Sequence, residues 1–324
     1  MQAVLRAGAA AAVSAPASAA NLGPGFDCVG LALGLRDEYA VEVTTATGLV
    51  VDIQGAGSGH LPRDERLLVA KGLRTALQAC GIPWLDELTA QGLGLRLQVR
   101  TGIPLSAGLG SSAASVVGGL GLGFALARGG SLTNDDLTLV NTHAGLLEGH
   151  PDNSSAATYG GLTVSWQPSS STVRTARLRL HDDIDPVVLV PTRARLATRT
   201  ARAALPPHVP FADAVRQSAR AALLTHALTT DPTLLLDATQ DWLHQEYRRA
   251  SYPTSMAAVD LLRSLGHPAT VSGAGPSVVV LALRGTADSV VAEARSWGRE
   301  WRILRPGVDT DGLHVREVSP TVPA

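Results

Sequence analysis

Apolar and polar side chains alternate over several short stretches of the chain, which is the pattern of half-buried β-strands. In residues 39–45, for example, Val41 and Val43 alternate with Glu42 and Thr44. Longer stretches repeat their apolar residues at helical spacing instead. In the first half of the chain these patterns predict strands at residues 13–18, 31–35, 39–45, 93–99 and 162–166, and helices at residues 66–80, 112–127 and 133–148.

The second half continues this mixture of strands and helices. Strands are predicted at residues 186–190, 269–272, 278–283 and 313–317, and helices at residues 213–228, 234–247 and 254–265. Because strands and helices do not follow a strict βαβ order, the predicted fold class is α+β in two domains. The Ser/Pro-rich residues 167–172 mark the predicted boundary, which separates a domain of residues 1–168 from one of residues 169–324.

The composition is that of a folded globular protein, and it narrows the range of partners. Apolar residues make up 45% of the chain and charged residues 17%, with a net charge of −1. No basic stripe with interleaved aromatic residues is present, so nucleic-acid binding is not expected. Residues 103–127 carry no charge, but glycines interrupt them, so they predict a loop and a buried helix and no membrane span. The isolated Cys28 and Cys80 predict free thiols in a cytoplasmic protein.

Three glycine-rich segments stand far apart in the sequence. They are residues 16–27 (PASAANLGPGFD), residues 104–114 (PLSAGLGSSAA) and residues 272–277 (SGAGPS). A glycine-rich loop that leads into an apolar helix exposes unpaired backbone N–H groups at the positive end of the helix dipole, and such groups favour phosphate. The middle segment has this form. The three segments together predict one nucleotide site that is assembled from separate parts of the fold.

The middle segment differs from two common nucleotide-binding loops. The lysine-containing phosphate loop needs a lysine after its last glycine, whereas the single lysine of this chain, Lys71, follows Ala70. Residues 108–113 also fit a loose dinucleotide fingerprint, but that site needs an acidic residue at the end of the next strand, and here a helix follows. The adjacent Ser111 and Ser112 at the predicted helix start suit a Mg²⁺ that bridges nucleotide phosphates, besides the plainer function of an N-cap.

Several polar side chains near these segments are candidates for a ligand site, and each also has an ordinary structural explanation. Asn21 and Asp27 flank a rigid Gly-Pro-Gly turn, and such residues commonly stabilise the turn itself. Residues 148–153 (EGHPDN) combine four polar side chains after an apolar helix, which fits either a solvated loop or a Mg²⁺ ligand at the glutamate. On local evidence alone, Arg202 and Arg248 would be surface arginines.

Four motifs follow one another along the chain: PASAANLGPGFDCVGLAL, PLSAGLGSSAAS, EGHPDN and VSGAGPS. In this order and at these separations they resemble the homoserine kinase branch of the GHMP small-molecule kinase superfamily. GLGSSAA indicates the superfamily, whereas PASxANLGPGFD and EGHPDN indicate the homoserine branch. Residues 198–206 and 244–248 are similar to that branch as well, and the resemblance covers residues 13–283.

The resemblance implies a two-domain GHMP kinase fold. Its N-terminal, ATP-binding domain is similar to ribosomal protein S5 domain 2, and its C-terminal domain is ferredoxin-like. ATP is the implied co-substrate and Mg²⁺ the implied metal, held by Ser112 and Glu148. The implied ATP-binding loop consists of Pro104, Leu105, Ser106, Ala107, Gly108, Leu109, Gly110, Ser111, Ser112, Ala113 and Ala114.

The resemblance also implies an amino-acid site and a reaction. The residues that match positions at the amino-acid end are Asn21, Asp27, His150, Asn153, Arg202 and Arg248. An acid such as Asp27 suits the substrate ammonium, and two guanidinium groups suit its carboxylate. The implied reaction is the ATP-dependent phosphorylation of the side-chain hydroxyl of L-homoserine to O-phospho-L-homoserine, in threonine biosynthesis. The implied catalytic residues are Ser112, Glu148, Asn153 and Thr198, of which Thr198 orients the hydroxyl, and no general base is assigned.

The chain departs from the family pattern near the nucleotide. Arg66-Leu67 stands where the family often has an asparagine close to the adenine, so the adenine contacts are left open. Ser106-Ala107 stands where Gly-Arg is common, which removes one cation from the phosphate loop.

Two alternatives keep the fold and change the function. Another small alcohol, such as mevalonate or a sugar, would need no acid paired with arginines, so Asp27, Arg202 and Arg248 favour an amino acid. A non-catalytic sensor of nucleotide or metabolite would not need Ser112 or Glu148, and both are present. Dimers are common in the superfamily, so a homodimer is a further expectation.

Overall fold

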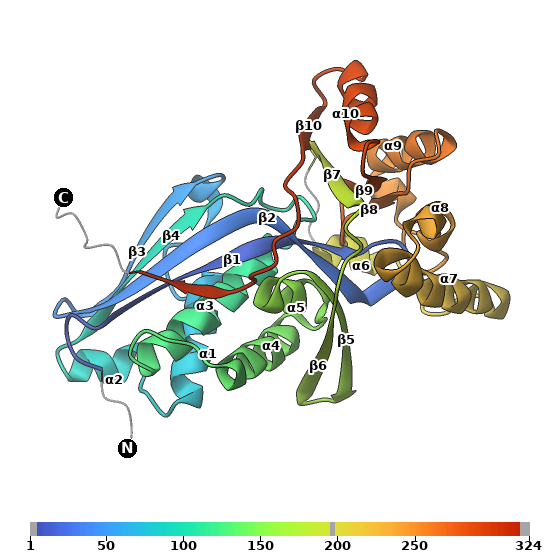
Figure 1. The fold of residues 1–324 in the computed structure, drawn as a ribbon. Helices are drawn as coiled ribbons and strands as arrows, with labels where there is room; N and C mark the ends of the chain where they lie inside the picture. Colours follow the sequence, from blue (N-terminus) through green and yellow to red (C-terminus); the bar gives the residue numbers. More distant parts are fainter. Residues whose placement is uncertain (1–4, 195–197, 318–324) are drawn as a thin grey trace.

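The computed structural model describes residues 5–194 and 198–317, except the side chains of Thr198 and Arg199. Its strands form two separate sheets, one of seven strands and one of four. Helices pack against each sheet, so the molecule has two units that lie side by side (Figure 1). The predicted α+β class is confirmed.

The first sheet contains one very long strand that organises the others. Its members are β1 (Ala10–Asn21), β2 (Gly25–Thr44), β3 (Gly48–Gly55), β4 (Gly94–Thr101), β5 (Leu162–Ser169), β6 (Thr172–Leu178) and β11 (His314–Arg316). The order is β11-β1-β2-β4-β3, and β2 pairs with β4 at one end and with β5 at the other. The strands predicted separately at residues 31–35 and 39–45 are therefore one continuous β2.

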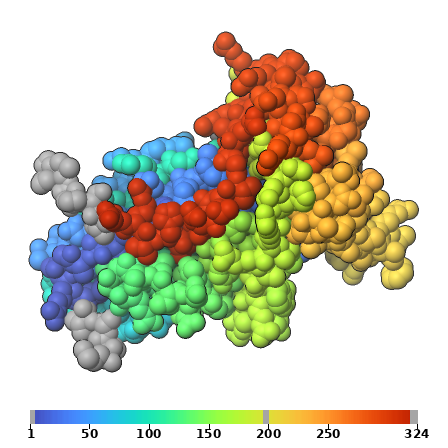
Figure 2. Space-filling model, viewed as in Figure 1, coloured from blue at the N-terminus to red at the C-terminus, as the bar shows by residue number. Residues whose placement is uncertain are grey.

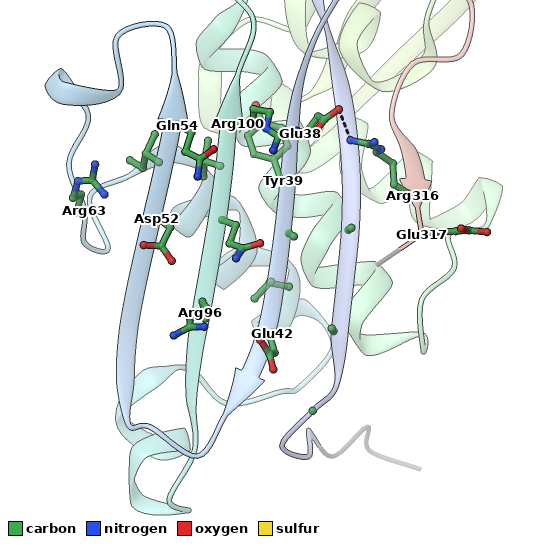
Figure 3. Close-up of a pocket in the computed structure, with 18 residues that line it drawn as sticks. Glu38, Tyr39, Glu42, Asp52, Gln54, Arg63, Arg96, Arg100, Arg316 and Glu317 are labelled. Carbon is green, nitrogen blue, oxygen red and sulfur yellow. Dashed lines mark ion pairs between the residues drawn. The ribbon is translucent and has the colours of Figure 1, made fainter. Parts of the chain in front are cut away.

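Helices cover one face of this sheet. They are α1 (Leu68–Ala79), α2 (Leu85–Ala90), α3 (Ser111–Ala127), α4 (Asn134–Glu148) and α5 (Asp152–Tyr159). The apolar α3 is buried along nearly its whole length between the sheet, α1 and α4. Glycines allow this close packing, since a Cβ at Gly119 would lie 2.1 Å from the carbonyl oxygen of Val69. The opposite face of the sheet carries charged side chains on β2, β3 and β4 (Figure 3).

The second sheet has the order β10-β7-β9-β8 with antiparallel pairing throughout. Its strands are β7 (Ile184–Pro191), β8 (Ala269–Val271), β9 (Val278–Leu283) and β10 (Trp301–Leu304). Because successive side chains of a strand point to opposite faces, β7 serves two cores. Val187 and Leu189 pack in the core of the second unit, whereas Val188 and Val190 belong to the large core of the first unit.

Helices and short turns complete the second unit. They are α6 (Thr198–Ala203), α7 (Phe211–Thr229), α8 (Leu235–Ala238), α9 (Pro253–Ser264) and α10 (Ala287–Ser296), with short 3₁₀ turns at Pro232–Leu234 and Arg249–Ser251 and, in the first unit, at Ser58–His60. The helix predicted at residues 234–247 is wrong beyond the four residues of α8. The carboxylate of Asp241 accepts the backbone N–H groups of Leu243, His244 and Gln245, which replaces the hydrogen bonds that a helix would form.

The first sheet draws its strands from both ends of the chain. Residues 167–172 lie at the tip of the β5–β6 hairpin, where Ser169 of β5 pairs with Thr172 of β6, so β6 still belongs to the first sheet. The predicted division between residues 168 and 169 falls inside this hairpin. Near the C-terminus, β11 returns to pair with β1, and this segment crosses the first unit in Figure 2.

Candidate active site

A cavity of about 720 Å³ lies between the two units. Its lining includes residues from all three glycine-rich segments, residues 148–153, and both predicted arginines, Arg202 and Arg248. Segments that are more than 250 positions apart in the sequence therefore meet in one place, as the three motifs predict.

The glycine-rich loop at residues 104–110 connects β4 to α3 and forms one wall of the cavity. Its backbone adopts left-handed conformations at Ser106 (φ 50°), Gly108 (φ 79°) and Gly110 (φ 68°). Gly110 is the N-cap of α3, and no side chain caps this end of the helix, so neither adjacent serine has the plainer function of an N-cap. The free N–H groups at the start of α3 therefore face an anion site.

Residues 272–277, a loop of the second unit, form hydrogen bonds with the carbonyl groups of the glycine-rich loop. The N–H of Ser277 donates to the carbonyl of Ala107 (3.0 Å), and the Ser272 hydroxyl donates to the carbonyl of Gly108 (2.7 Å). A Cβ at Gly108 would lie 2.4 Å from the Ser272 carbonyl oxygen, so only glycine permits this approach. The conformation of the glycine-rich loop therefore depends on both units.

Two side chains whose oxygens could bind a cation, Ser112 and Glu148, lie beside the glycine-rich loop. The Ser112 hydroxyl, in the first turn of α3, donates to Oε2 of Glu148 at the end of α4 (2.8 Å). Burial raises the pKa of Glu148 and outweighs the opposite effect of the Ser112 hydrogen bond. A carboxylate and a hydroxyl this close together fit a hard cation such as Mg²⁺, whose charge would offset the cost of burying the carboxylate.

The opposite end of the cavity is built from charged side chains. Asp27 and Arg202 form a two-bond ion pair, with N···O distances of 2.9 and 2.7 Å. Arg202 and Arg248 both lie over the ring of Phe26, at 5.5 and 5.3 Å from its centroid. Arg248 is only 1% exposed and donates to the carbonyl of Ala201 (3.0 Å), so the local interpretation of a surface arginine is wrong for this residue.

The turn before Asp27 is held by contacts from the second unit. Asn21 uses both ends of its amide, because Nδ2 donates to the carbonyl of Gly273 (2.9 Å) and Oδ1 accepts the N–H of Asp27 (3.0 Å). The buried His244 donates from Nε2 to the carbonyl of Gly23 (2.8 Å) and stacks on Phe26. These contacts keep Asn21 and Asp27 in left-handed conformations (φ 70° and 58°) that side chains rarely adopt.

Residues 148–153 line the cavity between its two ends, so they are not a solvated loop. Nδ1 of His150 lies 2.8 Å from Oδ1 of Asp152. Burial lowers the pKa of His150, but the hydrogen bond and the charge of Asp152 outweigh it and raise this pKa overall. Oδ1 of Asn153 accepts the Ser18 hydroxyl (2.8 Å), so its Nδ2 carries the donors, one of which reaches Oδ1 of Asp152 (3.3 Å).

Sequence reasoning missed some residues here. Asp152, Phe26 and Ser18 were not singled out, although Asp152 and Phe26 line the cavity and Ser18 holds Asn153. All three lie inside the motifs, which is the signal that could have identified them.

A few predicted site residues lie elsewhere or outside the description. Ala113 and Ala114 do not line the cavity; both are fully buried in α3 beneath the loop. Thr198 begins α6, but its side chain lies outside the described residues. Arg66 is exposed, and its guanidinium pairs with Asp64.

A second cavity, of about 710 Å³, lies on the uncovered face of the first sheet (Figure 3). Its acids and arginines stand on neighbouring strands, and Glu38 pairs with both Arg100 and Arg316. It contains none of the predicted site residues. Charges that neutralise one another in this way are typical of the solvated face of a sheet.

Comparisons with known proteins agree with this geometry. The profile described as "GHMP kinases N terminal domain" matches residues 69–161, and "GHMP kinases C terminal" matches residues 219–300. A homoserine kinase from Streptomyces coelicolor is 47% identical over 307 residues, which cover 95% of this chain and 94% of the relative. The chain belongs to the homoserine kinase family.

Further relatives extend the similarity over nearly the whole chain. A homoserine kinase from Clavibacter michiganensis is 40% identical over 98% of both chains. Among solved structures, a homoserine kinase from Cytophaga hutchinsonii has a TM-score of 0.81 at 24% identity and covers 97% of this chain and 99% of its own. A Leishmania major mevalonate kinase has a TM-score of 0.61 at 17% identity, over 94% of this chain and 98% of its own, so the fold extends beyond the family.

No helix in the described part of this homoserine kinase family member is long and apolar enough to cross a membrane.

Proposed function

We propose that this protein transfers the γ-phosphoryl group of ATP to the side-chain hydroxyl of L-homoserine, which gives ADP and O-phospho-L-homoserine for threonine biosynthesis. One observation carries the proposal: a single cavity joins a glycine-rich loop at a helix N-terminus to an acid that is paired with arginine. The membership in the homoserine kinase family supports the same reaction.

At the phosphate end, the backbone N–H groups of residues 108–112 bind the phosphate oxygens of ATP. Ser112 and Glu148 are the residues that would hold Mg²⁺, which when bound neutralises charge at the β- and γ-phosphates. Their oxygens are 2.8 Å apart, and burial raises the pKa of Glu148, a cost that a bound cation would offset.

At the amino-acid end, Asp27 binds the ammonium of homoserine, and Arg202 and Arg248 bind its carboxylate. The ion pair between Asp27 and Arg202 opens as the two charges of the substrate replace it. Asn21 accepts the backbone N–H of Asp27 and so positions this residue. His150 lines the cavity and pairs with Asp152.

The transfer step needs position and charge more than a strong base. The hydroxyl oxygen bonds to the γ-phosphorus while the bond from phosphorus to the bridging oxygen of ADP breaks, and the hydroxyl proton leaves to solvent. The Asn153 amide, oriented by Ser18, donates to the reacting groups from the side. Thr198 stays a candidate for orienting the hydroxyl.

The test is an ADP-release assay on the purified protein with Mg-ATP. The acceptors to compare are L-homoserine, D-homoserine, L-serine, L-threonine, mevalonate and galactose. ADP release that is strongly selective for L-homoserine is the expected result. Turnover of mevalonate or galactose instead would overturn the roles of Asp27, Arg202 and Arg248, and ATP binding without any turnover would favour a sensor.

Three further predictions accompany this function. The protein is cytoplasmic, it forms a homodimer, and its two domains follow the two sheets. In this division the ATP-binding unit contains the strands β1 to β6 and β11, and the second unit contains β7 to β10.

A further inference from the structure

Asp37 is a fully buried carboxylate outside the cavity, and the reaction gives it no task. It lies on the inner face of β2, in line with Tyr39, Val41 and Val43, which pack against the helices. No arginine, lysine or histidine in the described part of the chain forms an ion pair with it. A buried carboxylate without a cation is costly, so its presence needs a reason.

The contacts of Asp37 lead to the start of the glycine-rich loop. Its Oδ1 accepts the backbone N–H groups of Gly102 (2.7 Å) and Ile103 (2.9 Å), the two residues directly before the loop at residues 104–110. A Cβ at Gly102 would lie 2.5 Å from the carbonyl oxygen of Arg36, so the end of β4 approaches β2 very closely here. Asp37 therefore sets the point at which the chain leaves the sheet.

Tyr39 extends this contact to the far end of the loop. Its hydroxyl donates to Oδ2 of Asp37 (3.2 Å), and its ring packs on α3, the helix that follows the loop. The Tyr39 ring packs so tightly on α3 that a Cβ at Gly118 would lie 2.2 Å from it.

We propose that Asp37 is a positioning residue which, together with Tyr39, holds both ends of the glycine-rich loop so that its N–H groups converge on the phosphates of ATP. One side chain accepts the N–H groups of residues 102 and 103 before the loop, and the ring of its partner Tyr39 packs on α3 after it. The proposal rests on the proposed function only in naming ATP as the ligand.

The test compares three variants by calorimetric binding of Mg-ATP and, separately, by the KM for each substrate. Asp37→Ala removes both acceptors, and we expect ATP to bind about tenfold more weakly while the KM for L-homoserine changes less than about twofold. Asp37→Asn keeps an acceptor for the two N–H groups and a donor for Tyr39, so it should restore most of the affinity for ATP. Tyr39→Phe should weaken ATP binding about threefold, because it removes the hydrogen bond that orients Asp37.

Asp136→Ala is the matched control for a structural loss alone. Asp136 is equally buried and accepts the N–H of Thr133 in the capping box of α4, away from the loop. This variant should lower the melting temperature without changing the affinity for ATP. If Asp37→Ala and Tyr39→Phe leave ATP binding unchanged, or weaken both substrates equally, the proposal is wrong.

Two features keep the test decisive. If Asp37→Ala does not fold, the comparison of Tyr39→Phe with the wild type decides alone. Because nucleotide binding is measured directly, a failure of homoserine phosphorylation leaves this result unaffected and is seen separately in the ADP-release assay.

Discussion

The two ends of the cavity recognise charge by different means. The phosphate end presents backbone N–H groups of a glycine-rich loop, and its shape is set by contacts with residues 272–277 and with Asp37. The amino-acid end presents side chains, chiefly Asp27, Arg202 and Arg248, which neutralise or stack on one another around Phe26. The phosphate end therefore depends on the residues that pack against the glycine-rich loop. The amino-acid end depends on which charged side chains lie together.

This difference predicts different results for substitutions at the two ends. A change of Asp27 or Arg202 at the amino-acid end should affect one substrate and leave the fold intact, because these two side chains are partly exposed. A change at the phosphate end should disturb a packed backbone and therefore affect both ATP binding and stability. We expect substitutions of Ser112 and Glu148, the proposed Mg²⁺ ligands, to lower the rate most.

The largest effect is expected for Glu148→Gln. The variant keeps the shape of the side chain but loses the negative charge that would hold Mg²⁺ beside Ser112. We expect kcat to fall about 100-fold to 1000-fold and the Mg²⁺ requirement to rise, since one charge-stabilising group is lost. The measurement is a Mg²⁺ titration of the ADP-release rate. Glu246→Gln, which changes a surface pair with Arg249, is the control, and equal kinetics in both variants would refute the metal assignment.

The next largest effect is expected for Asp27→Asn. Loss of the charge leaves the substrate ammonium without its partner and Arg202 without its counter-ion. The KM for L-homoserine should rise about 10-fold to 100-fold, while the KM for ATP changes less than about twofold. Steady-state kinetics with each substrate varied in turn give the answer. Equal rises in both KM values would contradict the ammonium role, and Asp213→Asn on an exposed pair is the control.

A smaller effect is expected for Gly108→Ala, which should weaken ATP binding and lower the stability of the protein. The added Cβ would collide with the Ser272 carbonyl, so the loop must move away from the second unit. The KM for ATP should rise about tenfold. Gly266→Ala is a matched control, because its φ of 86° imposes the same backbone strain while no atom lies within 4 Å of the new Cβ. If the two variants lose stability equally and neither affects ATP, the packing argument is wrong.

The last prediction concerns the pH dependence of the free energy of unfolding, and we expect it to have the smallest effect on activity. Burial raises the pKa of Asp37 to about 6 from an ordinary value of 3.8, and the N–H groups of Ile103 and Gly102 oppose this only in part. The folded protein therefore binds more protons than the unfolded chain between about pH 4 and pH 6, so this group lowers stability as pH rises through that window. The total is about 3 kcal/mol, from a shift of about two units.

Asp37→Asn removes this titration. Relative to the wild type, the variant should gain stability between about pH 4 and pH 6 and show a constant difference above that range. Denaturant unfolding of both proteins at matched pH values measures the difference. Parallel stability profiles of the two proteins would contradict the raised pKa of Asp37.

Much of the fold could be predicted because local patterns agree with it. The strand alternation around Val41 and Val43 and the uninterrupted apolar helix after the glycine-rich loop correspond to β2 and α3. The predicted helix at residues 234–247 is wrong because Asp241 competes with the backbone for its N–H groups, which composition does not reveal. The strands β3, β6 and β10 and the helices α2, α5, α6 and α10 were not predicted.

The site was predictable to the extent that its residues lie in recognisable motifs. Ser112, Glu148, Asp27 and Arg202 all line one cavity, as the resemblance implies. Arg248 was readable locally only as a surface arginine, because its burial depends on Phe26 and on Ala201 from a distant helix.

The sequence alone determined which residue types stand at short spacing: a glycine-rich loop before an apolar helix, adjacent serines at the helix start, and four polar side chains in residues 148–153. The resemblance to a family added the expectation that Ser112 lies near Glu148 and that Asp27 and two arginines share one site. Only the tertiary structure decided that Asp27 meets Arg202 across 175 positions and that Asp37 holds a loop 65 positions away. Such meetings arise from the pairing of β2 with β4 and from the packing of the two units, and no local pattern encodes them.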